Sequence, residues 1–157
     1  MAHGELKDID RGWRAAIQSM AAAAGRPGAH VVVGWPEGSP QHAGSSMTVA
    51  QIASIHEFGL PPHIPERSML RATCELNSEK YTEALRKIGI GITYARIDLR
   101  RGLDLLGITI KGDVQKRIAA GIMPPNAPST IARKGSSKPL IHTGQMRAAL
   151  DHEVRGA

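Results

Sequence analysis

The segment ITYARIDLRRGLDLLGITIKGDVQKRIAA, residues 92–120, carries the longest regular apolar pattern in the chain. Its large aliphatic side chains recur at helical spacing: Ile92, Leu99, Leu103, Leu106, Ile110, Val114 and Ile118. This stripe predicts one amphipathic helix of up to ~40 Å, at about 1.5 Å per residue. Gly102, Gly107 and Gly112 each cost a helix about 1 kcal/mol relative to alanine. We therefore expect close packing against neighbours to hold this helix.

Shorter patterns on either side predict more helices and little strand. Apolar spacing predicts helices at three further places, residues 5–24, 49–58 and 66–88. The β-branched run at 30–35 predicts a buried strand, and residues 152–155 alternate weakly, as an edge strand would. We expect one α+β domain over residues 1–157, with a small antiparallel sheet packed against long helices.

Proline, glycine and serine mark the connections. Residues 36–47 predict a flexible loop, and residues 123–142 an extended arm rich in proline and basic residues. Within that arm, residues 129–133 can form one helical turn that Gly135 ends. Residues 61–65 hold three prolines and predict extended chain. Thr143 can cap a last short helix over residues 144–150.

Composition narrows the classes of protein. The chain has 157 residues, a formal charge of +6, one cysteine, and five aromatic residues (two Trp, two Tyr, one Phe). One cysteine excludes an internal disulfide, no apolar run approaches the roughly 20 residues of a membrane helix, and the first residues lack a signal peptide's apolar core. Five scattered aromatics argue against a base-stacking platform. We expect a protein of a reducing cytoplasm, without a membrane partner, that gains stability from neighbouring subunits.

The candidate catalytic residues do not form a site. His56 and Glu57 suggest a zinc-protease helix, but that motif needs a second histidine four residues on, where Leu60 stands. Cys74 lies within a predicted helix on the face of Leu70, so we expect a buried, inert thiol. The seven histidines show no metal spacing and the glycines form no phosphate loop. We expect no enzyme, no cofactor and no metal; a metal-dependent hydrolase is the third-ranked alternative.

The basic residues leave a choice of partner. Two groups stand out, Arg96, Arg100 and Arg101 on the predicted long helix, and Arg133, Lys134 and Lys138 in the arm. A solvated helix face explains the first group, and contact with DNA or an acidic partner is the alternative. The second group lies between Pro128 and Pro139 and can reach an acidic surface or a phosphate backbone. A basic nucleic-acid-binding protein is therefore the runner-up function.

Four segments of the chain resemble segments of a known family, and they occur in the same order as in that family. PPNAPSTIARKGSSKPLIHTGQM, residues 124–146, resembles a signature of tailed-bacteriophage neck and tail-completion proteins. VVVG at 31–34, VAQIASIHEFG at 49–59 and IPERSMLR at 64–71 resemble its other segments. The closest fit is the Mu-like virion morphogenesis family, over about two thirds of the chain. Ser68 and Met69 stand where the family has Pro-Phe, and His142 where it has Asp.

This resemblance implies a non-enzymatic α+β protomer of a ring in the head–tail junction of a virion assembled in the host cytoplasm. A ring of six is favoured over twelve. Its partners would be further copies, the head connector or stopper and the tail terminator, with double-stranded DNA passing through the lumen. We place inter-subunit or inter-ring contacts at ten residues: Pro124, Pro125, Asn126, Arg133, Lys134, Lys138, Glu57, Phe58, Arg67 and Arg71. Arg96, Arg100 and Arg101 would contact DNA or an acidic partner.

Overall fold

The computed structural model describes residues 13–24, 28–141 and 143–157. These residues form an α+β fold with seven helices and two strands. The elements are α1 (Trp13–Ala24), β1 (His30–Gly34), α2 (Val49–Phe58), α3 (Leu70–Leu76), α4 (Ser78–Thr93), α5 (Leu99–Ala120), α6 (Pro128–Lys134), α7 (Gln145–Ala148) and β2 (Asp151–Arg155).

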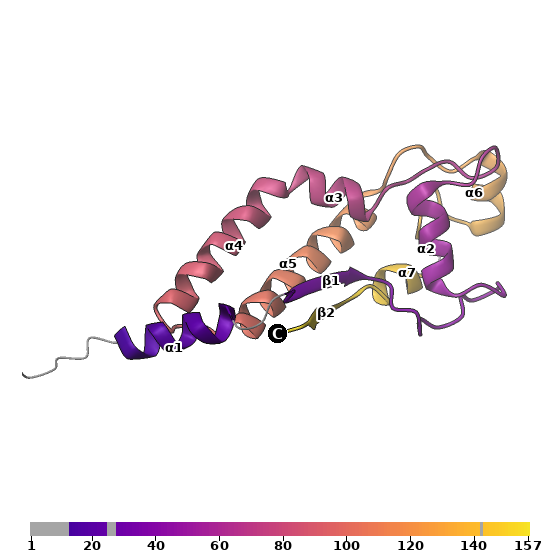
Figure 1. The fold of residues 1–157 in the computed structure, drawn as a ribbon. Helices are drawn as coiled ribbons and strands as arrows, with labels where there is room; N and C mark the ends of the chain where they lie inside the picture. The colour runs from indigo at the N-terminus through magenta and orange to yellow at the C-terminus, as the bar shows by residue number, and fades with distance from the viewer. Residues whose placement is uncertain (1–12, 25–27, 142) are drawn as a thin grey trace, which may run out of the picture.

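The long helix α5 organises the molecule. It packs against both strands on one side and against α3 and α4 on the other, and α1 packs across α4. Figure 1 shows an elongated arrangement, with α1 at one end and α2 and α6 at the other. The two strands lie beside the middle of the molecule.

The sheet is a single antiparallel pair with one covered face. His30 pairs with Arg155 at one end and Gly34 pairs with Asp151 at the other. Side chains alternate between the faces of a strand, and the half-buried ones belong to Val31, Val33, His152 and Val154. These residues face α5, whereas alternate residues such as Val32 are exposed on the opposite face.

Two glycines of α5 confirm the expectation of close packing. A Cβ on Gly107 would lie 2.4 Å from Cδ2 of His152 and 2.8 Å from Cγ2 of Val31. A Cβ on Gly102 would lie 2.4 Å from Cγ2 of Ile88 in α4. Gly112 has open space around it, so packing does not explain that glycine.

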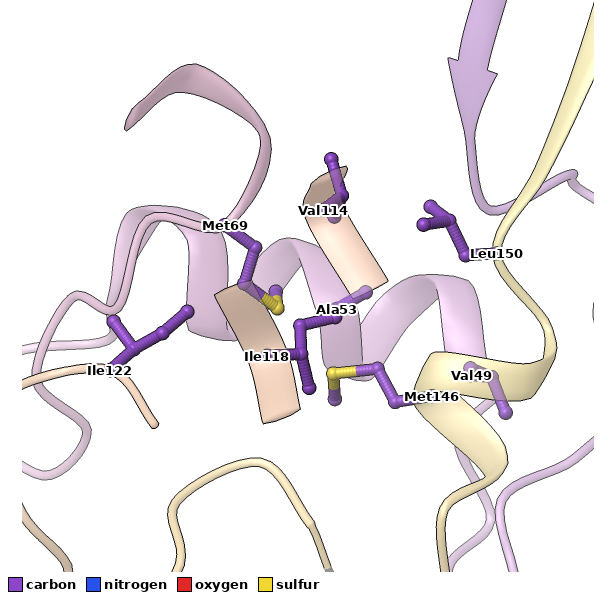
Figure 2. Packing of buried hydrophobic residues seen from close by; sticks show 8 residues of the cluster. All are labelled: Val49, Ala53, Met69, Val114, Ile118, Ile122, Met146 and Leu150. Carbon is purple, nitrogen blue, oxygen red and sulfur yellow. The ribbon is translucent and has the colours of Figure 1, made fainter. Parts of the chain in front are cut away.

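The main hydrophobic core lies between α2, α5 and α7, and Val33 of β1 packs against it. Figure 2 shows its buried residues, which are Val49, Ala53, Met69, Val114, Ile118, Ile122, Met146 and Leu150. Fully burying a side chain as large as Ile118 stabilises a protein by about 1.5–3 kcal/mol. The Trp35 indole N–H donates to the carbonyl of Met146 at 2.6 Å, which connects the end of β1 to this core.

Several predicted elements are confirmed. Thr48 caps α2 in a capping box with Gln51. Gly135, with φ of 68°, ends α6, and β2 forms near the predicted residues. In the 36–47 loop, Ala43 N–H donates to the Gln145 side chain at 2.9 Å, and the loop's flexibility stays a prediction. Residues 5–12 of the predicted first helix lie outside the described residues.

The prediction of two long helices over 66–88 and 92–120 was wrong, because three helices form. Asn77 separates α3 from α4, and its side-chain amide donates to the carbonyl of Thr73 at 2.8 Å, which competes with continuation of the helix. Ala95, with φ of 52°, lies in the connection from α4 to α5. Asp98 then caps α5 by accepting from Arg101 N–H at 2.9 Å. Ile92 therefore belongs to α4.

Three local predictions were also wrong. Residues 61–63 make a turn where extended chain was predicted, and backbone hydrogen bonds in both directions between Leu60 and Ile64 close it at 2.8 and 2.9 Å. The prolines need not donate there, because Leu60 and Ile64 keep their N–H groups. Cys74 is exposed because α3 turns the neighbouring Thr73 inward. Arg96 precedes α5 instead of lying on it.

Candidate functional site

Three of the four segments that carry the family resemblance meet at one place, which we call the Glu57–Arg67 junction. It joins the end of α2, the start of α3 and the proline segment 123–126. Glu57 lies in the last turn of α2 and is 4% exposed. Its carboxylate accepts hydrogen bonds from the backbone N–H groups of Met69 at 2.6 Å, Leu70 at 2.9 Å and Arg71 at 3.0 Å.

Glu57 supplies the cap that α3 lacks locally. The first N–H groups of a helix have no partner within the helix, and Met69 at the N-cap position gives no side-chain cap. A carboxylate placed there satisfies these donors and interacts favourably with the helix dipole. Glu57 thus links α2 to the start of α3, although the residue that it contacts there, Met69, lies twelve residues later in the chain.

The charge state of Glu57 follows from these contacts. Burial alone would raise its pKa, but hydrogen bonds from the backbone of Leu70, Arg71 and Met69 and from the Ser68 hydroxyl outweigh burial. Together they hold the pKa of Glu57 below its usual value. The Arg71 guanidinium adds a contact at 3.3 Å. Glu57 is therefore an anion, and its carboxylate oxygens accept hydrogen bonds that hold the start of α3.

Arg67 fixes the proline segment at the same junction. Its side chain is buried, and it donates from Nε to the carbonyl of Pro124 at 2.8 Å and from Nη2 to the carbonyl of Pro125 at 3.0 Å. Its backbone N–H donates to the carbonyl of His56 at 2.7 Å. Burial lowers the pKa of the Arg67 guanidinium, although arginine stays charged in proteins. Pro124, Pro125 and Arg67 therefore have intrachain partners; an additional subunit contact stays a prediction.

Asn126 closes the base of the arm. Its side-chain amide donates to the carbonyl of Ser137 at 3.3 Å, so residues 126–137 form a closed loop that carries α6. We call residues 126–138 the α6 arm. Arg133 and Lys138 are exposed on it, whereas the side chain of Lys134 lies outside the described part of the structure.

Exposed apolar residues surround the junction. Phe58 is 62% exposed, with the Arg71 guanidinium 4.9 Å from its ring centroid. Leu60 and Met123 are also exposed, at 51% and 75%. Gly59 holds the turn between Phe58 and Leu60, because its φ is 75° and a Cβ there would lie 2.9 Å from the backbone nitrogen of Glu66. The junction thus presents an apolar surface on a rigid frame.

The three arginines near the start of α5 do not form a uniformly basic surface. The Arg96 guanidinium lies 5.3 Å from the ring centroid of Tyr94, and Arg101 lies 3.5 Å from Asp104. Asp104 also contacts Nε2 of His152 at 2.9 Å. Arg100 and Arg101 line an open groove with Asp98, Asp104 and Glu153, so the groove mixes both signs of charge. DNA contact by these arginines stays a prediction.

The net charge of the chain lies in one stretch. Residues 114–150 contain no Asp or Glu and six basic residues, so their formal charge of +6 equals that of the whole chain. The basic residues are Lys116, Arg117, Arg133, Lys134, Lys138 and Arg147. Elsewhere the chain has 14 basic and 14 acidic residues, so their formal charges cancel. Some of them form ion pairs, such as Lys80–Asp113, Arg86–Glu83 and Lys111–Asp151. The positive charge is therefore concentrated at the C-terminal end of α5, the α6 arm and α7.

The remaining candidates for chemistry are not assembled into a site. Cys74 is exposed, but neighbouring atoms still remove part of the water around its thiol, which raises the thiol's pKa. The charges of Glu57 and Glu75 raise this pKa further, so the thiol form dominates at neutral pH. Over residues 13–24, 28–141 and 143–157, no group of three His, Cys, Asp or Glu residues is placed to hold a metal ion. Among the helices described, none has the length and apolarity of a membrane span.

Comparison of the chain with protein-family models, with curated proteins and with solved structures finds no match.

Proposed function

We propose that this protein is a non-enzymatic structural protein of a virion's head–tail junction. It would form a ring that joins the tail to the head connector and lets DNA pass. The observation that carries this proposal is the Glu57–Arg67 junction, where three segments resembling the family's motifs are held together by Glu57 and Arg67. Glu57 and Arg67 hold segments of the chain together and do not face a cavity. This arrangement fits a protein that assembles with other proteins.

The distribution of apolar side chains supports assembly with other chains. Twelve hydrophobic residues of the described chain are buried, and twelve large hydrophobic residues are exposed. Soluble monomers rarely leave large apolar patches uncovered, and such patches mark interaction sites. Burial of part of this surface against neighbours would compensate for the small core.

The shape of the molecule supports a ring. A ring protomer repeats one head-to-tail contact, which needs two different surfaces on each chain. Figure 1 shows α1, where Ile17 is 57% exposed, at the end of the molecule opposite the α6 arm. The chain therefore offers separate surfaces at separate ends, and a ring of six subunits is our expectation.

A basic nucleic-acid-binding protein is the second candidate, and the acid-free stretch 114–150 favours it. Basic side chains in a stretch of sequence without Asp or Glu attract phosphate, and affinity then falls steeply with salt. The stretch contains no Phe, Trp or Tyr, so duplex backbone would be a better ligand than stacked single strands. Salt-dependent binding of duplex DNA by the purified protein, at micromolar affinity or tighter, would favour this candidate.

Reconstitution of particles tests the proposed function. Filled heads and finished tails are prepared from a phage that lacks this protein, and purified protein is added to the mixture. We expect joined, infectious particles to appear in proportion to the added protein. A Glu57→Ala variant, which loses the frame of the junction, should join them poorly, whereas a Glu75→Ala variant should match the wild type. Heads and tails that stay separate with correctly folded protein would contradict the proposal.

A further inference from the structure

The outer face of the β1–β2 sheet is an uncovered groove. The described residues cover only the face toward α5. On the other face, Val32 is 38% exposed and forms a groove of about 370 Å³ with Trp35 and Pro36. The polar residues that line this groove are Glu37, Asp151, His152, Glu153 and Arg155. The groove therefore combines apolar residues with three carboxylates, one imidazole and one guanidinium, and the guanidinium is paired with Glu153.

These carboxylates can change partners at little cost. Asp151 contacts Lys111 at 2.9 Å with its side chain 62% exposed, and Glu153 contacts Arg155 at 2.7 Å with its side chain 63% exposed. Ion pairs at such exposed positions contribute little to the stability of a protein. Glu37 is exposed and forms no ion pair with another described residue. A basic partner could therefore approach the groove without breaking a strong contact.

The α6 arm has the complementary character. Pro128 and Ile131 give it apolar surface, and Arg133 is exposed near its tip with no carboxylate in the surrounding sequence from 114 to 150. The Asn126–Ser137 hydrogen bond closes the arm into a preformed unit, which reduces the entropy lost when it binds. In Figure 1, α6 lies beyond α2, and α7 separates it from the sheet.

We propose that the α6 arm of one copy docks on the outer sheet face of the next copy. This contact would be the head-to-tail interface of the ring, and to that extent it rests on the proposed function. A second copy is favoured over DNA as the occupant of the groove, because its three carboxylates outnumber its one arginine and repel phosphate. The same carboxylates and the apolar residues beside them suit an arm that carries arginine and isoleucine. The two surfaces lie on different parts of one chain, so the contact repeats from copy to copy.

Cross-linking between two single-cysteine chains tests the contact directly. In a Cys74→Ser background, a Val32→Cys chain is mixed with an Ala132→Cys chain under mild oxidation. We expect disulfide-linked dimers that need both chains. The matched control mixes Ala132→Cys with Glu79→Cys, which places an exposed cysteine on α4, and should give few dimers. Equal yields from the two mixtures, or a protein that stays monomeric, would overturn the proposal.

Charge reversal separates a second copy from DNA as the arm's partner. Arg133→Glu and Glu37→Arg should each weaken self-association about tenfold in sedimentation velocity, and an equimolar mixture of the two variants should recover part of it. Loss of DNA binding in Arg133→Glu with unchanged self-association would overturn the proposal. These assays use purified protein, so they can succeed when particle joining fails. Joining without cross-links would instead refute the contact and leave the proposed function standing.

Discussion

The carboxylate of Glu57, in the last turn of α2, accepts a hydrogen bond from the backbone N–H of Leu70, the first residue of α3, at 2.9 Å. The same carboxylate accepts from Met69 and Arg71, so one side chain caps a helix that begins thirteen residues later in the chain. The link between α2 and α3 at the junction therefore depends on a single buried anion.

Glu57→Gln should lower the free energy of unfolding by about 2–3 kcal/mol, because an amide loses the charge-assisted hydrogen bonds and turns its NH₂ group toward backbone donors. Urea denaturation measures this difference. Glu75→Gln, at an exposed position on α3, is the matched control and should stay within about 0.5 kcal/mol of the wild type. Equal stability of the two variants would show that Glu57 does not hold α3.

The contribution of Glu57 should disappear in acid. Its pKa is lowered in the folded protein from an ordinary value of 4.5, so its stabilisation is present above that value and is lost as pH falls through the folded pKa. The stability difference between wild type and Glu57→Gln should be full at neutral pH and shrink below about pH 4.5. Urea denaturation of both proteins across this range measures it. A difference that is independent of pH would contradict this assignment.

Arg67→Lys should loosen the proline segment while it preserves charge. Lysine cannot match the two parallel donations to the carbonyls of Pro124 and Pro125, so we expect a loss of about 1–3 kcal/mol. Hydrogen exchange measured by mass spectrometry should become faster at the amides around residues 121–127. Arg147→Lys, at an exposed position of α7, should leave that exchange unchanged. Unaltered exchange in Arg67→Lys would mean that other contacts hold the segment.

Two glycines of α5 should respond in opposite directions to alanine. Gly107→Ala forces a Cβ into His152 and Val31, so it should destabilise the protein by about 1–3 kcal/mol. Gly112→Ala meets open space and gains helix propensity, so it should stabilise by about 0.5–1 kcal/mol. Thermal unfolding of both variants tests the packing of α5 on the sheet. A stabilising Gly107→Ala would refute that packing.

Local signals in the sequence predicted the elements that local contacts build. Thr48 precedes α2 and forms its cap, and Gly135 ends α6 in the left-handed conformation that glycine favours. The break at Asn77 was missed because the apolar spacing continues across it, while the side-chain bond to Thr73 is visible only in the structure. Asp98 is a residue type that favours the N-cap position and could have predicted the start of α5. The apolar pattern, which begins earlier at Ile92, instead predicted a longer helix.

The junction could be predicted only in part. The resemblance singled out Glu57, Arg67, Pro124 and Pro125, but not that they are joined within one chain. The absence of a capping side chain at Met69 was a signal that α3 needs a distant acceptor. The partners of Arg67 are backbone carbonyls, and because every residue has one, the sequence cannot indicate which carbonyls an arginine contacts. Neither the open sheet face nor its carboxylate lining follows from strand propensity.

Electron microscopy of particles made by a phage without this protein tests the central claim most directly. The account predicts filled heads and finished tails that are separate from each other, and joined virions when the wild-type chain is supplied from a plasmid. Normal joined virions in the absence of the protein would contradict the account.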